Sequence, residues 1–328
     1  MLVAQDMEIQ KLIKALVANL PAEHNDEENF YTFIKRSFDE YITLLFSLDS
    51  VDVENLLADI DDFKGAKTRQ RFVNLVKTIN QKCLEILQLA YKGDLYTATS
   101  LLFKLLNYSK YTKGYLVEPY RNYFGFVIDN ERTYYRCVSF AKGEIPSNCN
   151  HLPYYLRYKS HTSRFNQIGY PCLYLASSLD LAIQEIIKEE YEDKDFYVSE
   201  FIPQKPLLLL NFVLPSENEI LEMNKYDMFR FLITYPIYIL NLTKTQHHNC
   251  EFKEEYLFSQ LFFHIWYMNK NYERFSWTGI CYTSMCNRNE YNIVIPALYN
   301  TKEPPHNNSI SDFIQDCIEE KGPYRIDL

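Results

Sequence analysis

Residues 164–185 of this chain, RFNQIGYPCLYLASSLDLAIQE, place a fixed cation before a predicted strand and a carboxylate in the helix predicted to follow it. Arg164 precedes a bend indicated by Gly169 and Pro171, and a guanidinium held by a rigid bend can offer a planar, bidentate fork to a diphosphate. Glu185 would face the other end of such a ligand. Each residue alone is more typical of a solvated surface position, but together they could hold one anionic ligand that contains a sugar.

Tyr174 lies on the short apolar strand between these two residues. Its ring could stack on an aromatic ligand or pack in the core, and core packing is the simpler interpretation. The next helix is expected over residues 179–192, with Ser177 or Ser178 as its cap. Its buried stripe is expected to contain Leu179, Ala182, Ile183 and Ile186. Glu185 borders this stripe, where a carboxylate either reaches into a cleft or forms a solvated pair.

Two further polar residues occur in predicted strands. Arg136 lies inside YYRCV, and an apolar strand would not tolerate an unpaired charge there. Ser284 follows GICYT at the end of a strand. Each of these signals is weak by itself, so the interpretation depends on how they combine along the chain.

Other reactive residue types form weaker patterns. His247, His248 and Cys250 in TQHHNC are metal-ligand types, yet no second ligand pair follows at suitable spacing, and a predicted strand argues against a site made by Cys281 and Cys286. Neither Gly-x-Gly-x-x-Gly nor Gly-x(4)-Gly-Lys-Ser/Thr occurs, so two common phosphate-binding loops are missing. We therefore expect no metal.

Composition bounds the class of protein. The chain has 328 residues, of which 47% are apolar, and a net charge of -9, which opposes non-specific binding of nucleic acid. The N-terminus lacks signal-peptide features, and the longest apolar runs, LLLLNFVLP and FLITYPIYIL, are about half the ~20 residues of a membrane helix. Eight cysteines without a Cys-x-x-Cys pair are typical of reduced thiols. We expect a soluble, cytoplasmic protein without a membrane partner.

Hydrophobic periodicity changes near residue 110. Helical spacing predicts helices over about 9–20, 28–48, 72–90 and 95–106, the last capped by Asp94. Seven later runs predict strands, namely YFGFVIDN, YYRCVSF, YPCLYLA, FYVSEFI, LLLLNFVL, GICYTSM and YNIVIPAL. Helices are expected between them at 179–192 and 252–270. This irregular alternation predicts an α+β fold with a mixed or antiparallel sheet over residues 111–328, preceded by an all-α accessory region over residues 1–110.

Four segments in order resemble the RES domain family, which is named for its Arg, Glu and Ser. They are YYRCVSF, RFNQIGYPCLYLASSLDLAIQE, YLFSQLFFHIWYMNKNYERFSWTGICYTSM and NIVIP, and they span roughly residues 130 to 300. The first 110 residues look like a helical region that precedes this domain in longer relatives. Two departures stand out: the usual Arg-Trp-Asn is Arg164-Phe165-Asn166 here, and the long insertion between Glu185 and Ser284 should place extra helices beside the site.

The resemblance implies a fold similar to ADP-ribosyltransferases and an activity that consumes NAD by breaking its nicotinamide–ribose bond. By motif matching, Glu185, Arg164 and Ser284 would be catalytic, and Arg136, Arg164 and Tyr174 would bind NAD. Loss of nicotinamide passes through an oxocarbenium-like ribose, so the Glu185 carboxylate would stabilise the developing positive charge. The arginines would hold the diphosphate, Tyr174 would stack on nicotinamide, and Ser284 would hydrogen-bond the ribose or an arginine. NAD is thus the expected substrate, and no metal is required.

Three classes of function stay open. The leading one is an NAD-degrading enzyme that acts as a toxin or defence effector, since short members of the family are toxins of toxin-antitoxin pairs. Water as acceptor would make it a glycohydrolase, and phosphate a phosphorylase. The second is an ADP-ribosyltransferase that modifies a protein or nucleic acid, and the third is a non-catalytic module that senses a nucleotide. The helical region would serve a homo-oligomer, or a partner such as an antitoxin or regulatory protein.

Overall fold

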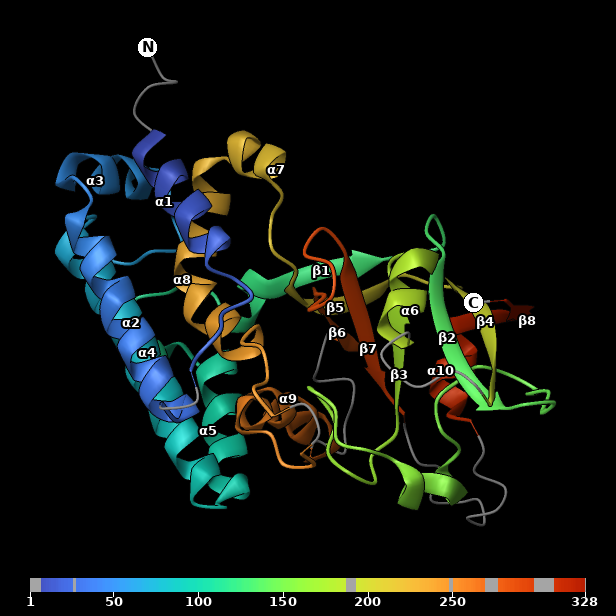
Figure 1. The fold of residues 1–328 in the computed structure, drawn as a ribbon. Helices are drawn as coiled ribbons and strands as arrows, with labels where there is room; N and C mark the ends of the chain where they lie inside the picture. Colours follow the sequence, from blue (N-terminus) through green and yellow to red (C-terminus); the bar gives the residue numbers. More distant parts are fainter. Residues whose placement is uncertain are drawn as a thin grey trace. The chain divides into compact units, whose positions relative to one another are not determined.

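The computed structural model describes residues 7–25, 28–186, 193–247, 250–268, 277–297 and 310–327. The chain divides into two compact units (Figure 1). The helical unit contains Met1–Phe124 and Leu214–Lys270, and the sheet unit contains Gly125–Val213 and Asn271–Leu328. Each unit has its own buried apolar core.

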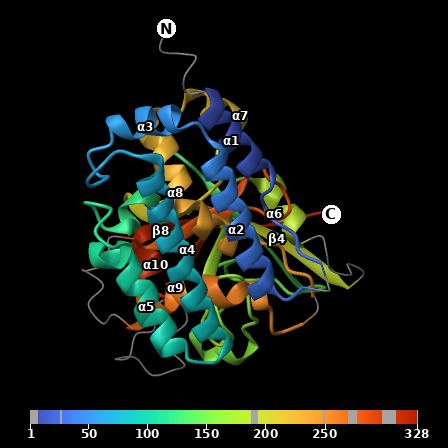
Figure 2. The ribbon, with the colours of Figure 1, turned by 90° about the vertical axis from the view of Figure 1, so that its left-hand side faces the viewer.

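Helices of the helical unit form where apolar residues recur at helical spacing. They are α1 (Met7–Ala18), α2 (Phe30–Ser47), α3 (Ser50–Ala58), α4 (Arg69–Tyr91), α5 (Leu95–Asn107), α7 (Glu217–Glu222), α8 (Lys225–Asn241) and α9 (Leu257–Met268). Three short 3-10 helices accompany them, η1 (Ser109–Thr112), η2 (Tyr120–Phe124) and η4 (Glu254–Tyr256). Asp94 caps α5 as predicted, because its side chain accepts a hydrogen bond from the Thr97 N–H. Figures 1 and 2 both show α4 lying beside α2, and α4 also contacts α5, α8 and α9.

Helix α8 is almost entirely buried and contains Pro236 in its interior. Proline has no N–H, so the carbonyl of Leu232, four residues earlier, loses its helical partner. The Tyr41 hydroxyl of α2 donates a hydrogen bond to that carbonyl over 2.6 Å, and the Tyr120 hydroxyl donates to the carbonyl of Ile233 over 2.7 Å. Tyr41 therefore replaces the partner that Pro236 removes, and Tyr120 adds a second hydrogen bond to the same turn of α8.

Within the described residues, the sheet unit contains an eight-stranded mixed sheet. The strands are β1 (Gly125–Ile128), β2 (Tyr134–Ala141), β3 (Cys172–Ala176), β4 (Lys194–Pro203), β5 (Leu207–Phe212), β6 (Gly279–Thr283), β7 (Tyr291–Pro296) and β8 (Ile318–Ile326). Their order across the sheet is β1-β5-β6-β7-β3-β2-β4-β8. The β5–β6 pair is parallel, and the other neighbouring pairs are antiparallel.

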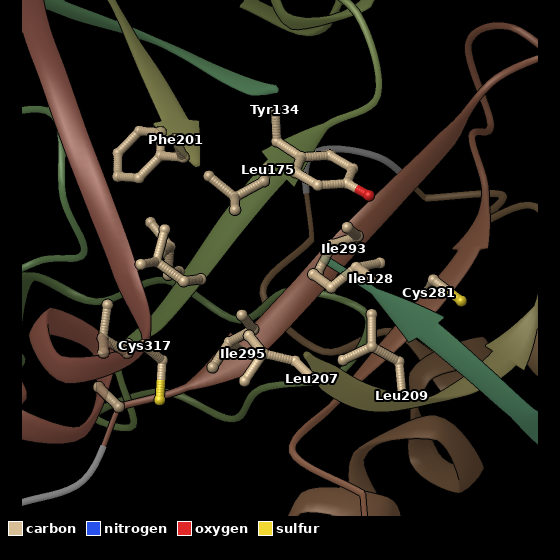
Figure 3. Packing of buried hydrophobic residues seen from close by; sticks show 14 of the residues in the cluster. Ile128, Tyr134, Leu175, Phe201, Leu207, Leu209, Cys281, Ile293, Ile295 and Cys317 are labelled. Carbon is tan, nitrogen blue, oxygen red and sulfur yellow. The ribbon is translucent and has the colours of Figure 1, made fainter. Parts of the chain in front are cut away.

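One face of the sheet carries an apolar core, which Figure 3 shows from close by. Leu175 of β3, Phe201 of β4, Leu209 of β5 and Ile293 of β7 lie in this cluster. Cys317, at the end of α10 (Asp312–Cys317), packs against it. This packing fixes the central strands between which the candidate site lies.

Helix α6 (Leu179–Ile186) contacts β2 and β3 on the opposite face of the sheet. Ser178 caps it, because its Oγ accepts a hydrogen bond from the Leu181 N–H over 3.1 Å. Leu181 and Ala182 are its buried residues. The predicted buried stripe is correct only for Ala182: Ile183 and Ile186 are half-buried, and Leu179, with which the helix begins, is 38% exposed. The predicted extension of this helix to residue 192 lies outside the described residues.

The predicted fold class is confirmed, since helices precede a mixed sheet in an α+β arrangement. The seven predicted strands correspond to β1 through β7. The two units do not follow a single division of the chain near residue 110, because α7, α8 and α9 return to the helical unit. In the part of the chain that the structure describes, no helix is both long and apolar enough to span a membrane.

Candidate functional site

A cavity of about 190 Å³ lies where the pairing of β2 with β3 stops. Tyr135 and Ala176 form the pair that joins these strands, whereas every residue of β2 pairs with β4. The cavity is lined by Tyr135, Arg136, Cys137, Tyr174, Leu175 and Ala176 of the strands and by Ala182, Glu185 and Ile186 of α6. Successive residues of a strand point to opposite faces, so a cavity lined by consecutive residues of both strands lies between them. We call it the β2–β3 gap.

Arg136 brings a positive charge to the β2–β3 gap. Its Nη1 atom is buried and has no hydrogen-bond partner among the described residues. Burial lowers the pKa of Arg136, while the nearby Cys149 and Glu320 act in the opposite direction. A buried guanidinium nitrogen without an acceptor is costly, and a phosphate oxygen is an acceptor that would satisfy it.

Glu185 lies near the end of α6 and is held from the sheet below. Its Oε1 accepts a hydrogen bond from the Ser284 hydroxyl over 3.2 Å and another from the Asn292 side-chain amide over 2.5 Å. Ser284 follows β6, and Asn292 lies on β7 directly opposite Ala176. Although Glu185 is exposed as a whole, both donors are buried, so the carboxylate has a fixed orientation at a boundary between protein and solvent.

A second carboxylate ties the start of α6 to the same hairpin. The Glu290 Oε2 accepts hydrogen bonds from the hydroxyls of Ser177 and Ser178, which precede the helix. The loop that carries Glu290 is closed by a hydrogen bond from the Ser284 N–H to the Glu290 carbonyl over 2.9 Å. The β6–β7 hairpin therefore holds α6 at both ends, through Glu290 at its start and through Glu185 at its end.

The segment Arg164-Phe165-Asn166 forms a turn that the Ser163 N–H closes by donating to the Asn166 carbonyl over 3.1 Å. Arg164 is 5% exposed, and Phe165 is fully buried. The Asn166 Oδ1 accepts a hydrogen bond from the Tyr174 hydroxyl over 2.8 Å. The turn is thus joined to the tyrosine that lines the β2–β3 gap.

The aromatic residue of this turn has a packing role. The Phe165 ring is stacked on Phe212 of β5, with 6.4 Å between centroids, and lies 5.0 Å from the Tyr282 ring of β6. A flat apolar ring satisfies these contacts, so phenylalanine can occupy the position where the family usually has tryptophan.

The structure brings together four of the five predicted site residues. Arg136, Tyr174 and Glu185 line the β2–β3 gap, and Ser284 is hydrogen-bonded to Glu185. Arg164 lies in the adjoining turn and is not part of the described lining. Their assignment to catalysis stays a prediction. Sequence reasoning missed Asn292 and Glu290; Asn292 begins the quoted segment NIVIP, and a polar residue in that apolar strand was a signal of its position beside the site.

Metal-ligand types do not gather in the described part of the chain. No group of three or more His, Cys, Asp or Glu there could hold a metal ion. The candidate metal-binding segment TQHHNC is only partly described by the structure, because His248 lies outside the described residues. All eight cysteines are free thiols.

Comparison with protein families identifies a domain whose matched residues belong to both units. The RES domain matches residues 144–309, half of the chain, and the chain therefore belongs to the RES domain family. Arg164, Tyr174, Glu185 and Ser284 lie within the matched residues, whereas Arg136 precedes them. No curated protein and no solved structure matches the chain. Membership of this family gives a coarse indication of an NAD-related, toxin-like function.

Proposed function

We propose that the protein degrades NAD by cleaving the bond between nicotinamide and ribose, and that it acts as a toxin or defence effector. One observation carries the proposal: the same gap in the sheet is lined by an oriented glutamate and by an arginine whose buried Nη1 has no hydrogen-bond partner among the described residues. The first group suits a diphosphate, and the second suits a sugar that becomes positively charged. Family membership supports NAD as the molecule that contains both.

Glu185 would stabilise the transition state. As nicotinamide leaves, positive charge develops on the ribose ring carbon and oxygen, and a carboxylate aimed at the ring lowers the energy of that state. The hydrogen bonds from Ser284 and Asn292 hold the carboxylate before the substrate arrives. The carboxylate then needs little reorientation during the reaction. Such preorganisation of charged groups is the main source of electrostatic catalysis.

Arg136 would bind the diphosphate, and its place between the strands would set the distance from phosphate to ribose. Tyr174 would offer its ring to nicotinamide while its hydroxyl stays bonded to Asn166. Arg164 would support the phosphates from the adjoining turn. Positioning of this kind can contribute several kcal/mol to the barrier reduction. No metal enters the proposed reaction.

The acceptor determines the name of the reaction. Attack by water on the ribosyl cation gives ADP-ribose, and attack by phosphate gives its 1-phosphate ester. Purified protein incubated with NAD, with and without phosphate, should release nicotinamide, and mass spectrometry should identify one of these products. The proposal would be contradicted if NAD persists in the presence of the wild-type protein, or if the Glu185→Gln variant consumes NAD at the same rate as wild type. Transfer of label from NAD to a macromolecule would identify a transferase instead.

The helical unit is proposed to mediate self-association or to bind an antitoxin or regulatory protein. Deleting residues 1–107 is a poor test, because α8 would lose Tyr41, which hydrogen-bonds Leu232. Light scattering on the full chain tests self-association directly: a mass of twice 39.1 kDa or more supports it, and a monomer at micromolar concentration contradicts it. Co-purification of the full chain with a candidate regulator that lowers NAD cleavage tests the second role.

A further inference from the structure

The β2–β3 gap is too small for a whole dinucleotide. Its volume of about 190 Å³ is below the roughly 300–1,000 Å³ of pockets that enclose a drug-sized ligand. If Glu185 faces the nicotinamide-bearing ribose, the adenine half of the substrate must lie outside the gap. This step rests on the proposed function, and it raises the question of which surface receives the adenine half.

The direction in which the β2–β3 gap widens indicates which surface would receive the adenine half. The strands pair at Ala176, the last residue of β3, and Cys172 at the start of β3 pairs with β7 but not with β2. The gap therefore opens toward the start of β3. Figure 1 shows the same course, with β2 and β3 close together near α6 and diverging toward their other ends.

A short 3-10 helix, η3 (Tyr154–Lys159), is fixed beside the start of β3. Its buried Tyr154 donates a hydroxyl hydrogen bond to the carbonyl of Ala297, and the Ala297 N–H donates to the Pro171 carbonyl over 3.1 Å. Both η3 and the residue preceding β3 are thus held by Ala297. The Arg157 guanidinium of η3 lies 5.5 Å from the ring centroid of Tyr170, which places η3 directly against this end of the strand.

Exposed aromatic rings and cations gather on this surface. Tyr158 is 72% exposed and Tyr155 is 48% exposed, and residues three apart share one side of a 3-10 helix. The turn from Gln167 to Tyr170 adds Ile168, which is also exposed, and Gly169 provides the positive φ of +83° that the turn requires. We call Tyr155, Arg157, Tyr158, Lys159 and Tyr170 the aromatic-basic patch.

Charge distinguishes the aromatic-basic patch from the rest of the chain. No Asp or Glu occurs between Glu144 and Asp180, although the chain carries 43 acidic residues and a net charge of -9. Tyrosine rings with Arg157 and Lys159, in a stretch of sequence without Asp or Glu, suit a ligand that combines an aromatic base with phosphate. We infer that the aromatic-basic patch binds the adenine nucleotide half of the substrate, with adenine on a tyrosine ring and phosphate near Arg157.

Adenosine diphosphate tests this inference, because it contains the adenine and diphosphate but no nicotinamide. Calorimetric titration should show binding to the wild-type chain, with the dissociation constant raised about tenfold in Tyr158→Ala and in Tyr155→Ala if each ring contributes to stacking. Tyr324→Ala is the matched control, since Tyr324 is a tyrosine on β8 whose exposed fraction, 53%, lies between those of Tyr155 and Tyr158, and this variant should bind like wild type. Equal affinity in the combined Tyr155→Ala, Tyr158→Ala variant, or no binding by wild type, would overturn the inference.

The failure of this inference can be distinguished from failure of the proposed function. Turnover of NAD that depends on Glu185 but has the same KM in the patch variants removes the adenine site and leaves the NAD-cleaving activity. Patch-dependent binding of adenosine diphosphate without NAD cleavage retains the nucleotide site and removes the activity. Because Tyr155 and Tyr158 are exposed, their substitution should leave the melting temperature unchanged, which circular dichroism can verify.

Discussion

The two edges of strand β2 differ in how completely they pair with the neighbouring strand. On one edge, all residues from Tyr134 to Ala141 pair with β4. On the other edge, pairing with β3 is confined to Tyr135, and a cavity lies beside it. The paired edge gives the sheet its continuity, whereas the open edge leaves room for a ligand within a layer that would otherwise be filled by backbone.

The surroundings of one carboxylate beside each edge show the consequence of this difference in pairing. Asp195, on the paired edge, is buried; its two oxygens accept hydrogen bonds from the Gly143 N–H over 2.8 Å and from Arg325 over 2.9 Å. Glu185, at the open edge, remains exposed as a residue and is oriented by Ser284 and Asn292. The first carboxylate completes a structural contact, while the second faces a cavity.

The largest expected effect comes from exchanging each carboxylate for its amide. Glu185→Gln keeps the shape of the side chain and removes the charge that would stabilise the ribosyl cation, so kcat for NAD cleavage should fall about a hundredfold or more. Asp195→Asn should leave kcat near the wild-type value and lower the melting temperature, because it weakens the contact with Arg325. A loss of activity in Asp195→Asn as large as in Glu185→Gln would remove the contrast between the edges.

The second prediction concerns His151, in the loop that follows β2. His151 is neutral, because its Nδ1–H donates to the Leu152 carbonyl while its Nε2 accepts from the Ser311 N–H at the start of α10. Burial lowers the pKa of His151 to about 4. The unfolded chain, with an ordinary pKa near 6.5, therefore takes up this proton first as the pH falls. Between pH 6.5 and 4, the free energy of unfolding should decrease by up to about 3 kcal/mol.

Urea unfolding of wild type and of His151→Gln at several pH values measures this effect. The variant should be less stable than wild type at pH 7, because glutamine does not reproduce both hydrogen bonds, and its stability should depend less on pH. Carboxylates contribute equally to both proteins, so the difference between the two curves isolates the histidine. Parallel curves would show that His151 does not bind its proton as inferred.

The helices and central strands were predictable because their causes are local. Helix α5 follows from the cap at Asp94 and the apolar spacing after it, and β7 follows from a run of branched apolar residues. Helix α8 was not predicted, since Pro236 and its many aromatic and β-branched residues disfavour a helix, and Tyr41 supplies the missing contact from far away in the sequence. Strand β8 was missed because it is an exposed edge strand with charged residues and a Gly-Pro step.

The candidate site was predictable as a set of residue types but not as an arrangement. Arg136 was recognisable as a charged residue within an apolar strand, and in the described part of the chain its buried Nη1 has no hydrogen-bond partner. The interruption of β2–β3 pairing depends on two segments that are 30 or more residues apart, and no local pattern encodes it. The same holds for Asn292, whose importance appears only when β7 lies beside β3 and below α6.

The third prediction tests how the open edge holds its carboxylate. Asn292→Ala removes the amide donor to Glu185, so kcat should fall about tenfold while KM for NAD changes little. Ser284→Ala removes the other donor and should have a similar effect. The double variant should lose less than the product of the two separate losses, because both bonds restrain one oxygen atom. Fully multiplicative losses would show that the two residues act independently of each other, which contradicts a shared restraint on one oxygen atom.

The smallest expected effect is a gain of stability at the open edge. Arg136→Met replaces a buried guanidinium, one nitrogen of which has no acceptor in the described part of the chain, by an apolar side chain of similar length. Removing that desolvated group should raise the free energy of unfolding by about 1 kcal/mol, while KM for NAD rises because the diphosphate loses its cation. Arg325→Met on β8 is the control, since it removes an exposed arginine that pairs with the buried Asp195 and should lower stability slightly. If Arg136→Met instead unfolds the protein at a lower urea concentration than wild type, Arg136 is a structural residue, and the open edge is stabilised by the cation itself.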